Sequence, residues 1–179
     1  GTTSATFQVT VNNVAPTLIV PPDHTVNEGS QLSITDIGQF TDPGFDNPLN
    51  IGGETTETFT YSIDWGDGTS ADSGDATIDS PGSIGVPTAG SFDGSHTYAD
   101  NGVYTVTLTV TDDDGGVGSD TLTVTVHNVA PVVDAGIDQT ADERTTVSFS
   151  GDFTDAGSAD THAVAWDFGD GATAAGTLT

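Results

Sequence analysis

Basic residues are almost missing from this chain. Lysine and arginine together number 1, which is Arg144, against 27 aspartates and glutamates, and the formal net charge is −26. A surface of this sign repels the phosphates of nucleic acids and of anionic membranes, so we expect neither as a partner. Cysteine is absent, so the fold must depend on its core, its size or bound metal ions instead of disulfides. No apolar run approaches the length of a transmembrane helix, and we expect no membrane insertion in this segment.

The acidic residues are strongly biased in type. Of the 27 acids, 23 are aspartate and 4 are glutamate. Aspartate favours turns and short-range oxygen ligation of cations, whereas an acidic chain selected only for solubility would accept glutamate equally well. The bias therefore predicts acidic loops between strands.

Several segments alternate apolar residues with threonine. Residues 104–111, 121–126 and 7–11 show this period of two, with β-branched residues on the polar face. Such alternation is the pattern of half-buried antiparallel strands. With 23 glycines and 8 prolines, we expect no helix of normal length, and hence an all-β sandwich of about seven strands per unit. The predicted core contains Trp65, Tyr104, Val106, Leu108, Leu122 and Val124.

Internal repeats divide the chain into units. Three short motifs return in the same order: Asn-Val-Ala-Pro at 13–16 and 128–131, Phe-Thr-Asp at 40–42 and 153–155, and Gly-Asp-Gly at 66–68 and 169–171. The first copy carries extra residues in a Gly/Asn/Pro-rich stretch, 43–53, which we interpret as a loop.

The repeats also suggest where each unit begins. Residues 1–12 match the end of the complete copy and are predicted to be the last strand of a preceding domain, pairing outside the core of the next one. Residues 13–127 are predicted to be a complete domain, and residues 128–179 the N-terminal half of a following one. We interpret the chain as a window on a longer tandem array.

Two elements of the repeat resemble a known family. Residues 65–69, Trp-Gly-Asp-Gly-Thr, are followed by residues 100–106, Asp-Asn-Gly-Val-Tyr-Thr-Val, and the first element returns at 166–171 as Trp-Asp-Phe-Gly-Asp-Gly. This pairing resembles the polycystic kidney disease (PKD) domain, an Ig-like antiparallel β-sandwich of extracellular proteins. The resemblance implies tandem Ig-like sandwiches at the cell surface or in a secreted protein. Tyr104 is then expected to form a tyrosine corner, with Val106 where Ig domains carry a cysteine.

An Ig-like strand order brings three polar segments to one end of the complete domain. They are the linker at 12–13 and the loops at 41–46 and 112–116. Like charges gathered there would repel unless a hard divalent cation joined them. Some PKD domains of secreted proteases bind calcium near the linker through Asn and Asp, and the resemblance implies Ca²⁺ here too. The matching candidates are Asn13, Asp42, Asp112 and Asp114 in the complete unit and Asn128, Asp155 and Asp160 in the next.

Other interpretations of these residues stay open. The acidic loops also suit ordinary solvated turns or adaptation to salt, and no single loop has EF-hand spacing. The pairs Asp64/Asp67 and Asp167/Asp170 lie in Gly-Asp-Gly turns, so we expect no catalysis and no enzyme. His96 is expected to be structural, and the two tryptophans are expected in the core more than on a sugar-stacking surface.

The sequence favours a non-catalytic extracellular repeat, acting as a rod, spacer or adhesive segment stiffened by calcium. Its partners would be neighbouring repeats of the same polypeptide, with other surface proteins or glycans beside them. The alternative is an accessory substrate-binding module of a secreted protease or polysaccharide hydrolase, which an exposed aromatic strip would support. Strand exchange between chains is a third reading, ranked below simple truncation of an array.

Overall fold

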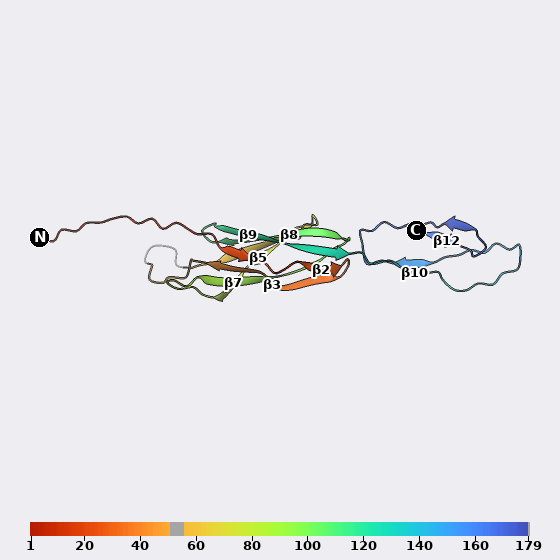
Figure 1. Cartoon of the computed structure of the whole chain (residues 1–179), viewed down its shortest axis with the longest axis horizontal. Helices are drawn as coiled ribbons and strands as arrows, with labels where there is room; N and C mark the ends of the chain where they lie inside the picture. Colours follow the sequence, from red (N-terminus) through yellow and green to blue (C-terminus); the bar gives the residue numbers. More distant parts are fainter. Residues whose placement is uncertain (51–55, 179) are drawn as a thin grey trace.

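The computed structural model describes residues 1–50 and 56–178. Residues 17–127 form a two-layered β-sandwich, from which the N-terminal segment leaves at one end while residues 128–178 lie beyond the other end (Figure 1). Residues 43–50 of the predicted loop carry no strand, and its remainder, 51–53, lies outside the described residues. Within the described residues the chain is all-β, and no helix there is long and apolar enough to cross a membrane.

The first sheet of the sandwich has four strands and is antiparallel throughout. Its central pair shifts register between Ile34 and Gly38, which marks a bulge. In spatial order the strands are β1 (Thr17–Ile19), β3 (Gln31–Asp42), β7 (Thr88–Thr97) and β6 (Thr77–Ser80).

The second sheet has five strands, and its first pair, β2 with β9, is parallel. The chain thus changes sheet between β1 and β2, where Pro21 and Pro22 cannot donate the hydrogen bonds of a continuous ladder. In spatial order the strands are β2 (His24–Asn27), β9 (Val117–His127), β8 (Gly102–Asp112), β4 (Phe59–Asp64) and β5 (Asp72–Asp75).

The apolar faces of the two sheets meet in one core. Five predicted members are buried there, Trp65, Val106, Leu108, Leu122 and Val124, each with no more than 3% of its surface exposed. The prediction that Tyr104 lies in the core is only partly right, because its side chain is partly buried and packs against the edge of the core. The fully buried tyrosine is Tyr98.

Tyr104 nevertheless forms the predicted tyrosine corner. Its hydroxyl donates to the Asp100 carbonyl at 2.9 Å, and its ring stacks on Tyr98 with centroids 4.4 Å apart. Val106, two residues on, is completely buried. The corner therefore closes the turn before β8 onto that strand.

The segments on either side of the sandwich have little regular structure. Residues 1–13 form no strand, and Phe7, Val9 and Val11 are exposed, away from the sandwich core. Their pairing within a preceding domain stays a prediction. Residues 128–178 contain two small antiparallel sheets, made of β10 (Val132–Asp134) with β11 (Asp152–Thr154) and of β12 (Ala165–Asp167) with β13 (Thr173–Ala175).

Candidate metal sites at the two ends of the sandwich

Two carboxylates meet at the end of the sandwich nearest the N-terminal segment. Asp42 is the last residue of β3 and Asp112 the last of β8, so strands of both sheets deliver them to the same end. They are 2% and 6% exposed. The Asp42 Oδ1 atom accepts a hydrogen bond from the Gly44 amide at 2.6 Å, whereas its buried Oδ2 has no partner.

The linker joins this pair through Asn13. The Asn13 Nδ2 atom donates to both carboxylate oxygens of Asp112, at 3.1 and 2.9 Å, and the Gly116 amide donates to Asp112 Oδ1 at 2.6 Å. The linker and the loop between β8 and β9 are thereby joined around one carboxylate. The structure thus brings together the three segments whose convergence the strand order predicts.

Electrostatic repulsion is strong at this end. Burial raises the pKa of Asp42. The hydrogen bond from the Gly44 amide lowers this pKa, but the charges of Asp112 and Asp113 raise it further. Glu57, which precedes β4, has its pKa raised to about 7, first by burial and then by the surrounding aspartates, Asp113 foremost. Sequence reasoning missed Glu57. Asp114 is exposed, and its charge is one of those that raise the pKa of Glu57.

The residues at this end suit a hard divalent cation. A buried carboxylate oxygen without a partner is costly unless a proton or a cation satisfies it. Ca²⁺ takes 6–8 oxygen ligands from carboxylates, amide carbonyls and water. Asp42 and Asp112 supply carboxylates, and rotating the Asn13 amide would present its oxygen instead of its nitrogen.

A second acidic group occupies the opposite end, at the junction with residues 128–178. Asp155 and Asp160, both predicted candidates, lie there with His162, each offering one ligand atom within 4.8 Å of the others. The His162 Nε2 atom is 2.6 Å from Asp155 Oδ2, and this contact is the main cause lowering the pKa of Asp155. Asn128 is exposed and, among the described residues, its side chain has no hydrogen-bond partner.

Two further carboxylates at the junction come from the sandwich itself. Glu28, in the turn after β2, and Asp100, in the turn before β8, form a second group with Asp160, again within 4.8 Å. Sequence reasoning missed both residues. A signal existed for Glu28, because the rare glutamate of Asn27-Glu28 returns in the next repeat as Asp142-Glu143.

The Gly-Asp-Gly turns are structural in both copies. The Asp64 and Asp67 carboxylates accept the amides of Gly66 and Thr69, each at 3.0 Å. In the next repeat, Asp167 and Asp170 accept the amides of Gly169 and Ala172 in the same way. Carboxylates engaged as acceptors within their own turns have the arrangement of Asx turns.

The first copy of this turn is fastened to β7. His96 lies with its Nε2 atom 2.7 Å from Asp67 Oδ2, and its ring stacks on Trp65 with centroids 5.0 Å apart. The Tyr98 hydroxyl donates to the Trp65 carbonyl at 3.2 Å. His96 thus has contacts within the fold and Trp65 lies in the core, as the sequence predicts, and the stacking of the two rings is found only in the structure.

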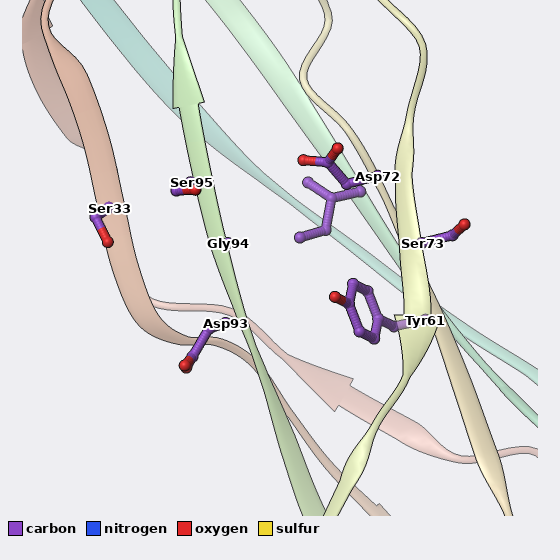
Figure 2. Close-up of a pocket in the computed structure, with 8 residues that line it drawn as sticks. Ser33, Tyr61, Asp72, Ser73, Asp93, Gly94 and Ser95 are labelled. Carbon is purple, nitrogen blue, oxygen red and sulfur yellow. The ribbon is translucent and has the colours of Figure 1, made fainter.

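An open hollow of about 450 Å³ lies between β7 of one sheet and the β4–β5 edge of the other (Figure 2). Both of its carboxylates already have partners: Asp72 Oδ2 accepts Trp65 Nε1–H at 2.8 Å, and Asp93 Oδ1 accepts the Asp36 amide at 2.8 Å. The Tyr61 ring stacks on Phe92 at 4.5 Å. Asp72, Asp93 and Tyr61 of this hollow are therefore engaged in contacts within the sandwich.

The fold defines an Ig-like β-sandwich module with acidic groups at both of its ends. The family model for the PKD domain matches residues 13–126 and 128–178, and the chain belongs to this family. The PKD domain is by itself a non-catalytic module.

The comparison with solved structures finds similarity to the PKD domain of an M14-like peptidase from Thermoplasmatales archaeon SCGC AB-540-F20. The two are 24% identical with a TM-score of 0.38, over 64% of this chain and 98% of that one. The comparison with curated proteins finds no match.

Proposed function

We propose that this chain is a non-catalytic segment of an extracellular repeat protein, a rod, spacer or adhesive region that calcium stiffens. The observation that carries the proposal is the buried Asp42 carboxylate, whose Oδ2 atom has no partner and which lies in the field of Asp112. A cation there would join the linker to the ends of β3 and β8.

The short linkers support a stiff array over a flexible one. The Val129 amide, in the linker after the sandwich, donates to Glu28 at 2.6 Å, and the Ala159 amide of the next segment donates to the Ala99 carbonyl at 3.1 Å. Consecutive units thus share hydrogen bonds, which restrict independent swinging of the two units.

An accessory substrate-binding module is the second candidate. The observation that would favour it is an aromatic strip on one sheet of the sandwich. Several aromatic side chains of residues 17–127 instead pack on one another, as Tyr61 stacks on Phe92 and Tyr98 on Tyr104. The repeat function is therefore the better supported.

Thermal unfolding in calcium and in sodium chloride of equal ionic strength tests the proposal. Extracellular modules bind calcium with dissociation constants of about 10⁻⁴–10⁻³ M. At ten times that constant, one site stabilises the fold by roughly 1.4 kcal/mol, and each kcal/mol raises the Tm of a domain of about 100 residues by about 4–8 °C. We expect a calcium-specific rise of several degrees.

Two variants assign that rise to the site. Asp42→Asn removes the charge at nearly constant shape and should diminish the rise, whereas Asp138→Asn, in an exposed loop of the next unit, should leave it intact. Equal rises in both salts would leave only generic charge screening. The acidic loops would then be solvated turns.

A further inference from the structure

The junction between the sandwich and the next unit is a packed interface. The Glu28–Gly29 turn is fastened to the sandwich, because Glu28 N–H donates to the His127 carbonyl at 3.0 Å and Gly29 N–H to the Tyr98 carbonyl at 2.9 Å. Gly29 has a φ of +68°, and a Cβ there would come within 2.5 Å of the Ala156 carbonyl oxygen. The backbone of the next unit therefore rests directly on this turn.

Glu28 is the unusual residue of this interface. It has no exposed surface, and only one of its carboxylate oxygens is satisfied: Oε1 accepts the Val129 amide, while Oε2 is buried without a partner. An ionised carboxylate left half-satisfied in a protein interior is strongly destabilising. A proton or a bound cation would remove this cost.

Two further carboxylates face the same place. Glu28, Asp100 and Asp160 each bring one carboxylate oxygen within 4.8 Å of the others. A Cβ on the buried Gly157 would come 2.8 Å from the Asp160 carboxyl carbon and 2.9 Å from that of Glu28. The two carboxyl groups thus converge on a glycine that leaves them room.

The carboxylates at the junction repel one another, and His162 opposes this effect at Asp160. Burial raises the pKa of Asp160, and the charges of Glu28, Asp155 and Asp100 raise it further, with His162 acting in the opposite direction. The ring of His162 is held by Asp155. One proton shared within the group would leave the other carboxylates ionised, whereas a divalent cation with oxygen ligands at about 2.3–2.6 Å would neutralise several at once.

We propose that Glu28 and Asp100 of the sandwich and Asp160 of the following unit together bind one divalent cation of the calcium type. The ion would join two consecutive repeats through ligands from both. This proposal rests on the proposed calcium-stiffened array, but it adds Glu28 and Asp100 of the sandwich, two ligands that the Asn–Asp pattern of the linker does not include.

The repeat supplies a second line of support. Glu143-Arg144 occupies the place of Glu28-Gly29 in the following unit, and Arg144 has the same left-handed backbone as Gly29, with φ of 69° against 68°. The turn and its glutamate therefore recur although the chain has only 4 glutamates. Glu143 is exposed, so Glu143→Gln is a matched control for Glu28→Gln.

Paramagnetic NMR of the full 179-residue chain with Mn²⁺ as a probe, displaced afterwards by Ca²⁺, tests the proposal. We expect broadening of the Gly29, Gly157 and Ala159 amides at the junction. The Gly44 and Gly116 amides report independently on the other end. Glu28→Gln should weaken junction binding by at least about tenfold, since affinity follows ligand charge, while Glu143→Gln should not.

Each outcome decides between the two sites. Broadening at Gly44 and Gly116 alone would overturn the junction site and leave the proposed function standing, and broadening at neither end would overturn both. Junction broadening that persists in Glu28→Gln would overturn the shared site in favour of ligands from the following unit alone.

Hydrogen exchange separates a ligand role from a structural one. Glutamine keeps an oxygen for the Val129 amide, so Glu28→Gln should fold with its junction intact. The Val129 and Ala159 amides should gain protection on addition of Ca²⁺ in the wild type and in Glu143→Gln. Equal gains in Glu28→Gln would contradict the proposal.

Discussion

At the scale of single residues, the two glycines of the first Gly-Asp-Gly turn have different tasks. Both have left-handed backbone, with φ of +78° at Gly66 and +82° at Gly68. A Cβ on Gly66 would come 2.4 Å from the Thr105 carbonyl oxygen, whereas one on Gly68 would meet open space. Gly66 is therefore needed both for its conformation and for close approach of the turn to β8.

Alanine substitutions should separate these two requirements. Gly68→Ala carries only the conformational cost, about 1–2 kcal/mol of unfolding free energy. Gly66→Ala adds displacement of the β8 backbone and should cost about 3 kcal/mol or more in total. Chemical denaturation measures both values, and equal losses for the two variants would show that the contact with Thr105 is unimportant.

At the scale of elements, the turn after β4 is held to β7 by a chain of polar and aromatic contacts. Asp67 accepts from the Thr69 hydroxyl at 2.6 Å and lies 2.7 Å from the His96 ring nitrogen, which itself belongs to β7. Burial opposes the charge of Asp67, but its hydrogen bonds to Thr69 and His96 prevail and lower its pKa. The turn thus ties the two sheets together.

The stability that Asp67 contributes should depend on pH. Because the folded-state pKa lies below the ordinary value of 3.8, this contribution is present above about pH 4 and is lost as pH falls through the lowered pKa. Asp67→Asn should therefore cost about 1.5–3 kcal/mol near pH 7, the range for hydrogen bonds to a charged group. Urea unfolding at pH 7 and pH 3 measures the difference, and a deficit that is unchanged at pH 3 would refute the ionic contribution.

Much of this architecture can be predicted from the sequence, because β8 and β9 alternate apolar residues with threonine and the turn motifs repeat. The change of sheet between β1 and β2 could not be predicted, because strands of three and four residues are too short to show a periodic pattern. Tyr98 follows a polar stretch of β7, so nothing local marks it as more buried than Tyr104. Glu28 and Asp160 meet only through the packing of two units, which no local pattern encodes.

At the scale of the whole molecule, acidic groups gather at both ends of one sandwich. One end joins the preceding linker through Asn13 and Asp112, and the other meets the following unit through Glu28 and Asp160. With a net charge of −26, consecutive units repel one another wherever these ends meet without a cation. Calcium would change that repulsion into attachment, so stiffness would depend on its concentration.

The central claim is that calcium makes neighbouring units move as one body, and ¹⁵N relaxation of the full chain measures this directly. In calcium, we predict one common rotational correlation time for the strand amides of residues 17–127 and 132–175. In chelator with sodium chloride of equal ionic strength, the smaller segment should tumble faster than the sandwich. Independent tumbling in both conditions, or a common correlation time in both, would contradict the claim.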